Sequence, residues 1–105
     1  MMEIIETPIF TKLITDLISD DSYSLLQKEL AENPEKGKLF EGGGGIRKIR
    51  WKYKQAGKSG GLRIIYYFEK QNKIYMLYAY PKNEQEDLTR EQIKVFKSAV
   101  KEHIK

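Results

Sequence analysis

Basic side chains alternate with apolar ones in the middle of this 105-residue chain. The basic members of the stretch are Lys48, Arg50, Lys52 and Lys54. A period of two places alternate side chains on opposite faces of a β-strand, so these four cations share one face. Neighbours on that face lie about 7 Å apart, which is within a Debye length at cellular salt. Like charges held so close repel one another, and a polyanion lying across the face would replace this repulsion with attraction.

The positive charge of the chain is concentrated in this region. The formal net charge is +4, yet residues 42–68 alone carry seven basic and no acidic side chains. Arg63 interrupts the next apolar segment, and its planar guanidinium group suits the oxygens of a phosphate. Two simpler interpretations stay open. The lysines could serve only solubility and edge protection, and Arg63 could pair with a carboxylate from elsewhere in the chain.

Composition excludes several other kinds of site. The chain has no cysteine, which excludes disulfides, thiolate zinc sites and thiol catalysis. Its single histidine, His103, excludes a multi-histidine metal site, so we expect neither a metal nor another cofactor. The segment Gly57-Lys58-Ser59 resembles the end of a P-loop. However, the motif requires glycine where Lys52 stands, and the segment lies between two predicted strands.

The chain also lacks the sequence signals of a membrane or exported protein. It contains no apolar run of about 18 residues, and Met1–Phe10 has no basic region before an apolar stretch. We therefore expect a cytoplasmic protein without membrane contact.

The usual acid–base side chains are missing from residues 42–68, but cleavage of RNA does not require all of them. The 2′-hydroxyl of RNA is a built-in nucleophile, so a protein need only orient it and stabilise the charge that develops on phosphorus. A lysine surrounded by other cations gives up its proton more readily and could act as a general base. Composition and spacing allow this chemistry without establishing it.

The surrounding sequence predicts an α+β domain over residues 1–105. The expected elements are a short strand at Glu3–Glu6, helices over 8–17 and 20–32, strands over 45–54, 62–68 and 73–80, and a last helix that starts after Thr89. Short turns between the three later strands predict an antiparallel meander. We expect the N-terminal helices to form a hairpin, and all helices to pack on one face of a curved antiparallel sheet.

Several segments resemble the RelE/HigB toxins of bacterial type II toxin–antitoxin systems, within the RelE/ParE superfamily. The segments are Gly43–Arg50, Gly57–Tyr67 and Tyr80–Leu88, preceded by Glu32–Gly37. The similarity covers nearly the whole chain and is greatest to the HigB-like branch. It implies a compact microbial ribonuclease fold. It also implies a metal-independent endoribonuclease that cleaves mRNA in the ribosomal A site and so inhibits translation.

The resemblance also implies which residues act. Lys48 and Arg50 match two basic positions on the first meander strand, and Arg63 matches the arginine of the glycine-rich segment. Lys82 matches a further basic residue that would protonate the leaving oxygen, with Asn83 as the alternative match. We therefore expect Lys48, Arg50, Arg63 and Lys82 to be catalytic, with Lys48 as the candidate base.

Other basic residues would hold RNA by charge. These candidates are Arg47, Lys52, Lys54 and Lys58. The tyrosine that stacks on the substrate base in some relatives has no counterpart near Leu88, which leaves Tyr53 and Tyr80 as substitutes.

The partners that the resemblance implies are the 70S ribosome with its mRNA and a cognate antitoxin. In the HigB-like branch the antitoxin is a HigA-like helix-turn-helix protein, and the toxin meets operator DNA only through it. Two alternatives stay open. One is a ParE-like inhibitor of DNA gyrase with the same fold and no ribonuclease activity, and the other is a non-catalytic RNA-binding module.

Overall fold

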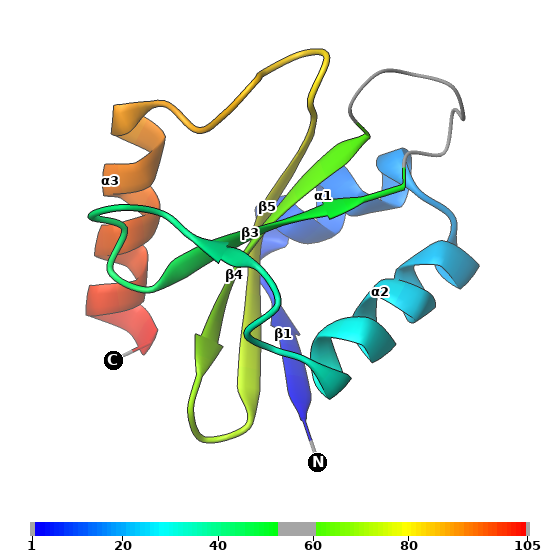
Figure 1. The fold of residues 1–105 in the computed structure, drawn as a ribbon, viewed down its shortest axis with the longest axis horizontal. Helices are drawn as coiled ribbons and strands as arrows, with labels where there is room; N and C mark the ends of the chain where they lie inside the picture. Colours follow the sequence, from blue (N-terminus) through cyan, green and yellow to red (C-terminus); the bar gives the residue numbers. More distant parts are fainter. Residues whose placement is uncertain (1, 53–60, 105) are drawn as a thin grey trace.

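A mixed β-sheet forms the centre of the protein (Figure 1). The structure is a computed structural model that describes residues 2–52 and 61–104. Within those residues the sheet has five strands in the order β1-β5-β4-β3-β2. Their bounds are β1 Glu3–Glu6, β2 Lys38–Leu39, β3 Ile46–Trp51, β4 Leu62–Glu69 and β5 Lys73–Pro81. The two most apolar strands, β4 and β5, lie inside the sheet, as continuous apolar runs require.

The predicted meander is confirmed, because β3 pairs with β4 and β4 with β5 in antiparallel orientation. The expectation of a fully antiparallel sheet is wrong at one edge. There β1 runs parallel to β5, with Glu3 opposite Lys73. The two strands are far apart in sequence, so no hairpin turn constrains their direction. The two-residue strand β2, which pairs with β3, was not predicted.

Three helices cover the sheet, and each begins at a side-chain cap. The helices are α1 Pro8–Leu17, α2 Asp20–Glu32 and α3 Arg90–Ala99, which continues into the π-helical segment η1 Val100–Ile104. The hydroxyl groups of Thr7, Ser19 and Thr89 accept hydrogen bonds from backbone amides of the first turns. The capping box predicted at Thr89 and Gln92 is present. None of the helices that the structure describes has the length and apolarity needed to span a bilayer.

The helices do not share one face of the sheet, contrary to the expectation from sequence (Figure 1). Helices α1 and α2 pack on one face, where their core includes Ile49, Ile64 and Met76. Helix α3 packs on the other face, near Ile65 and Leu77. A sheet whose central strands are apolar on both sides needs cover on both sides, and α3 supplies the second layer.

Candidate nucleic-acid interface

Two arginines and a tyrosine lie side by side across three strands. Arg50 on β3 is directly opposite Arg63 on β4, and Arg63 is directly opposite Tyr80 on β5. The row lies on the sheet face that α3 covers in part, since Tyr80 belongs to the core on that side. Arg50 is exposed and Arg63 is partly buried. Directly opposed side chains on paired strands have Cβ atoms about 5 Å apart, so the two arginines are neighbours across β3 and β4.

Like charges directly opposite each other on paired strands repel. The structure gives Arg63 a long hydrogen bond of 3.4 Å from Nη1 to the carbonyl oxygen of Leu62. Its charge also acts on Tyr80 and on Asp87. Arg63 therefore stands at the centre of the cationic face, with Arg50 on one side and polar groups on the other.

Lys48 lies two residues before Arg50 and on the same face, but it has an acidic partner. Its Nζ donates a hydrogen bond of 2.9 Å to Oδ2 of Asp87 and lies 4.9 Å from the centre of the Phe40 ring. The other carboxylate oxygen of Asp87 accepts a 2.9 Å hydrogen bond from the backbone amide of Leu88. The face that carries no acid of its own along residues 42–68 thus receives one from the loop before α3.

The contacts of Asp87 keep its carboxyl group ionised. Burial by itself would raise its pKa, but the hydrogen bonds from Lys48 and Leu88 and the charge of Arg63 together lower it. A lowered pKa in the folded state stabilises the fold above the ordinary carboxyl value of about 3.9. That contribution disappears only as the pH falls through the lowered pKa. The Lys48–Asp87 pair is therefore intact at neutral pH.

Asp87 is the site residue that sequence reasoning missed. It is 39 positions from Lys48, and only the packing of α3 brings the two together. The sequence signal that could have pointed to Asp87 is its position two residues before the helix cap Thr89, which places its carboxylate at the start of α3.

Tyr80 closes the row as a buried side chain. It is 4% exposed, and its hydroxyl group is buried without a hydrogen-bond partner among the residues that the structure describes. Burial and then the charge of Asp87 raise its pKa to about 12, against the opposing charge of Arg63. A ring so buried offers no face to a nucleic-acid base, so Tyr80 does not suit the stacking role considered from the sequence.

We expect Tyr80→Phe to leave stability unchanged or to raise it by about 1 kcal/mol, because it removes a buried hydroxyl group that has no partner. Urea denaturation measures the change. Tyr66→Phe is the matched control, since the Tyr66 hydroxyl accepts from Gly37 N at 2.8 Å and donates to Pro34 O at 2.9 Å. That control should lose roughly 1–3 kcal/mol. A comparable loss in both variants would show that Tyr80 has a partner in solution.

Lys82 and Lys52 flank the row at one end of the sheet. Lys82 follows the last residue of β5, and its backbone amide donates to the carbonyl oxygen of Gly61 at 2.9 Å. It lines a shallow hollow of about 390 Å³ together with Asn83, so both residues that could match the family's basic position lie in one loop. Lys52 follows β3 and is exposed. The candidates Tyr53, Lys54 and Lys58 lie outside the described residues.

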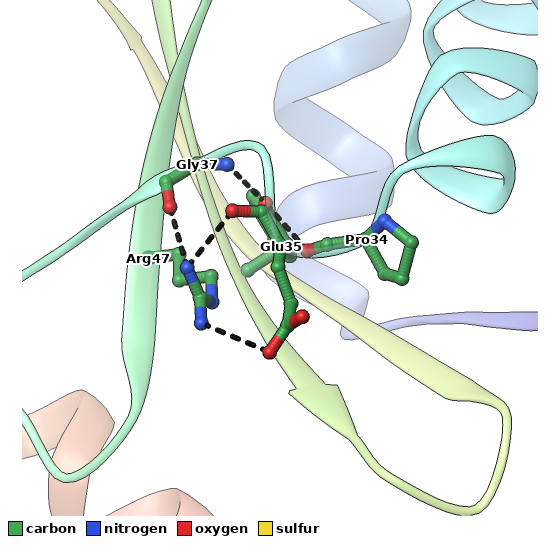
Figure 2. A network of polar contacts seen from close by, with 5 residues as sticks. Pro34, Glu35, Gly37 and Arg47 are labelled. Carbon is green, nitrogen blue, oxygen red and sulfur yellow. Dashed lines mark hydrogen bonds and ion pairs between the residues drawn. The ribbon is translucent and has the colours of Figure 1, made fainter.

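Arg47 lies on the opposite face of the sheet from Lys48 and Arg50. It is directly opposite Tyr66, which belongs to the core under α1 and α2. Figure 2 shows its guanidinium group turned toward the chain after α2. Nη1 donates to the carbonyl oxygens of Glu35 at 3.1 Å and Gly37 at 2.7 Å, and Nη2 lies 3.7 Å from the Glu35 carboxylate.

These contacts give Arg47 a structural role. Its side chain is only 16% exposed, and its donors hold the segment between α2 and β2 against the sheet. Arg47 is therefore close in sequence to Lys48 and Arg50 but lies on the opposite face of the sheet.

No group of three or more His, Asp or Glu side chains suited to a metal occurs among the described residues. The two arginines, Lys48 and Asp87 offer electrostatic and acid–base chemistry. The guanidinium groups of Arg50 and Arg63 lie on neighbouring strands, and the ammonium group of Lys48 on the same face is paired with the carboxylate of Asp87. This set can bind a phosphodiester, stabilise added negative charge on it and exchange a proton with a nearby hydroxyl.

Known proteins resemble this chain both in fold and in sequence. The crystal structure of the intact E. coli RelBE toxin–antitoxin complex contains a chain that matches with a TM-score of 0.57. The match covers 77% of this chain and 96% of that chain at 20% sequence identity, which shows a shared fold. The sequence model for one family, the RelE toxin of the RelE/RelB toxin–antitoxin system, matches residues 2–105. The chain therefore belongs to the RelE toxin family.

Proposed function

We propose that this protein is the toxin of a type II toxin–antitoxin system and that it cleaves mRNA in the A site of the ribosome. The observation that carries the proposal is the row of Arg50 and Arg63, in register on adjacent strands, beside the Lys48–Asp87 pair. Like charges directly opposite each other repel, and a phosphodiester lying across Arg50 and Arg63 would attract both.

In the proposed reaction, Arg50 and Arg63 bind the non-bridging oxygens of the scissile phosphate. The 2′-hydroxyl attacks phosphorus, the bond to the 5′ oxygen breaks, and the two guanidinium groups stabilise the extra charge of the transition state. The products are a 2′,3′-cyclic phosphate and a 5′-hydroxyl group. The chemistry needs no metal at the phosphate, because the nucleophile belongs to the substrate.

The Lys48–Asp87 pair refines the assignment of the base. The Nζ atom of Lys48 donates to Oδ2 of Asp87 at 2.9 Å, so the carboxylate fixes the position of the candidate base. We therefore keep Lys48 as the candidate that accepts the proton of the 2′-hydroxyl, and assign to Asp87 the positioning of the Lys48 side chain. Lys82 stays the candidate that protonates the leaving 5′ oxygen, and Lys52 the nearest described residue for holding the strand by charge.

The proposal includes a partner that keeps the toxin inactive. A toxin of this family needs a cognate antitoxin, and the matched E. coli chain was crystallised in a toxin–antitoxin complex. We propose an antitoxin of the HigA-like helix-turn-helix type, on the basis of the sequence resemblance to the HigB-like branch. Contact with operator DNA would then occur only through the antitoxin.

The experiment that tests the proposal compares three substrates with one preparation of protein. Programmed 70S ribosomes, free mRNA and supercoiled DNA with gyrase are each incubated with the toxin. We expect cuts in the A-site codon on ribosomes, little cleavage of free mRNA, and normal supercoiling. Inhibited supercoiling with intact mRNA would instead support the ParE-like alternative. Salt-sensitive RNA binding without any product would support the non-catalytic RNA-binding module.

Replacing Asp87 by asparagine should free Lys48 to contact RNA. We expect the affinity for a short single-stranded RNA to rise several-fold. The slope of log K against log salt concentration should also steepen by about 0.7, the value for one added phosphate contact on a single strand. Fluorescence anisotropy at several salt concentrations measures both quantities.

The matched control is Glu86→Gln, which removes the same charge from an exposed neighbour in the same loop. It should change the slope much less. Equal changes in the two variants would mean that overall charge, and not release of Lys48, decides the affinity.

A further inference from the structure

The loop over residues 82–88 carries Asp87 and joins β5 to α3. Its first half is fixed at the end of β5, where the carbonyl oxygen of Pro81 accepts hydrogen bonds from the backbone amides of Glu84 at 3.1 Å and Gln85 at 3.3 Å. The Asp87 side chain further along the loop is half exposed, so packing alone does not fix it. The position of its carboxylate must come from polar contacts.

Gln85 supplies such a contact from within the loop. Its Nε2 group donates a hydrogen bond of 2.8 Å to the backbone carbonyl oxygen of Asp87 and a second one to Oε1 of Gln92, in the first turn of α3. A side-chain amide nitrogen carries two N–H groups, so both donors are used. The partly buried side chain of Gln85 thus ties the loop to the helix.

Only a donor suits the position of this amide nitrogen. The backbone oxygen of Asp87 is a carbonyl, and Oε1 of Gln92 already accepts from the backbone amide of Thr89 at 3.0 Å. Both groups that face Gln85 are therefore acceptors. Turning the amide around would set its oxygen against two other oxygens, so the hydrogen-bond network itself decides which end is the nitrogen.

The helix cap does not depend on Gln85. The hydroxyl oxygen of Thr89 accepts from the backbone amide of Gln92 at 3.1 Å, and Gln92 accepts in return from the backbone amide of Thr89. These two bonds complete the capping box by themselves. What Gln85 adds is a bond to the backbone of Asp87, so its effect is directed at the residue that holds Lys48.

From Asp87 the contacts lead to the row of arginines. One carboxylate oxygen accepts from the backbone amide of Leu88 and the other from Nζ of Lys48, each at 2.9 Å. Leu88 is buried in the core on the α3 side of the sheet, so its amide is a fixed point. With the backbone of Asp87 held by Gln85 and one oxygen held by Leu88, the second oxygen is directed at Lys48.

We propose that Gln85 is a positioning residue of the proposed catalytic site, whose amide fixes the Asp87 backbone so that the carboxylate holds Lys48 beside the row of arginines. This inference rests on the proposed function, because Lys48 needs a defined position only if the row binds a phosphodiester. Misplacement of a reacting group by about 1 Å can cost about 10²-fold in rate, so an amide that does not touch the substrate can have a measurable effect.

The first test uses Gln85→Met, which keeps the length of the side chain and removes both donors. In single-turnover cleavage on programmed ribosomes we expect the rate at saturation to fall about ten-fold, as for a slightly misplaced base. The ribosome concentration at half saturation should not rise, because the arginines are unchanged. Gln71→Met, the same substitution in the exposed turn between β4 and β5, should cleave at the wild-type rate.

Urea denaturation shows whether the variant is folded under the assay conditions. If Gln85→Met does not fold, Gln85→Glu takes its place, because it has the same shape and lacks the donors. A wild-type rate of cleavage by a folded variant would overturn the proposal.

A double-mutant cycle separates positioning from a general structural effect. If Gln85 acts through Asp87, Gln85→Met should slow cleavage in the wild-type background and have little further effect in an Asp87→Ala background. Equal losses in the two backgrounds would mean that Gln85 acts elsewhere, and would overturn the proposal.

A readout without RNA distinguishes this proposal from a failure of the proposed function. The backbone amide of Leu88 donates to the Asp87 carboxylate, so its hydrogen exchange, measured by NMR, should be several-fold faster in Gln85→Met and unchanged in Gln71→Met. Faster exchange in the variant of a protein whose wild type cleaves nothing would support the hold of Gln85 on Asp87 and remove the catalytic proposal. Unchanged exchange of Leu88 would overturn the claim that Gln85 positions Asp87.

Discussion

The Arg63→Ala protein should cleave mRNA on programmed ribosomes roughly 10²–10³ times more slowly than the wild type, the loss that follows removal of one donor to a developing oxyanion. Arg63 lies at the centre of the cationic face, between Arg50 and Tyr80 in the cross-strand row. Its charge reaches Asp87 as well, so its loss weakens the electrostatics of the whole face. Single-turnover cleavage with saturating ribosomes measures the chemical step.

Two matched variants sharpen this prediction. Arg63→Lys keeps the charge but loses the planar fork, so we expect an intermediate rate. Arg90→Ala removes the same side chain from an exposed position at the start of α3 and should cleave normally. Wild-type cleavage by a folded Arg63→Ala protein would contradict the catalytic assignment.

The Gly37→Ala protein should be destabilised by roughly 3 kcal/mol, the largest effect on folding that we expect from a single methyl group. An added Cβ would lie 2.5 Å from the hydroxyl oxygen of Tyr66 and 2.7 Å from its Cε1 atom. Tyr66 is fully buried and cannot move aside. The clash also breaks the hydrogen bonds that Gly37 makes with Tyr66 and Arg47 (Figure 2).

Thermal and urea denaturation measure this effect, with Gly42→Ala as the control. Gly42 has a φ of +68° but no atom within 4 Å of an added Cβ, so only backbone strain of about 1 kcal/mol is expected there. If the two variants lost equal stability, the clash with Tyr66 would cost no more than the backbone strain at Gly42, and the expected loss for Gly37→Ala would be contradicted.

The cationic row could be predicted from sequence because strand geometry is local. Alternation assigned Lys48 and Arg50 to one face of β3 and placed Arg63 on the adjoining strand, whereas the register that puts Arg63 opposite Arg50 came from the structure. The same alternation places Arg47 on the other face, beside Ile49 and away from the row. The prediction that Arg47 binds RNA rests on its basic side chain, whereas its position on β3 places it away from the other candidates.

The features that could not be predicted from sequence depend on contacts between segments that are distant in the chain. Asp87 reaches Lys48 only because α3 packs on the same face as the row. The sequence does not show which face of the sheet α3 covers, because β4 is apolar on both sides. Ile64 faces α1 and α2, and Ile65 faces α3. The parallel edge strand β1 likewise depends on a pairing with β5 that no local turn encodes.

The central claim is that this cationic face directs the 2′-hydroxyl of mRNA at its own phosphodiester bond. The most direct test is the chemical identity of the new ends that the wild-type protein produces on programmed ribosomes, determined by mass spectrometry of the fragments. Our account predicts a 2′,3′-cyclic phosphate on the upstream fragment and a 5′-hydroxyl group on the downstream fragment. An upstream 3′-hydroxyl with a downstream 5′-phosphate would mean that water is the nucleophile, and would contradict the account.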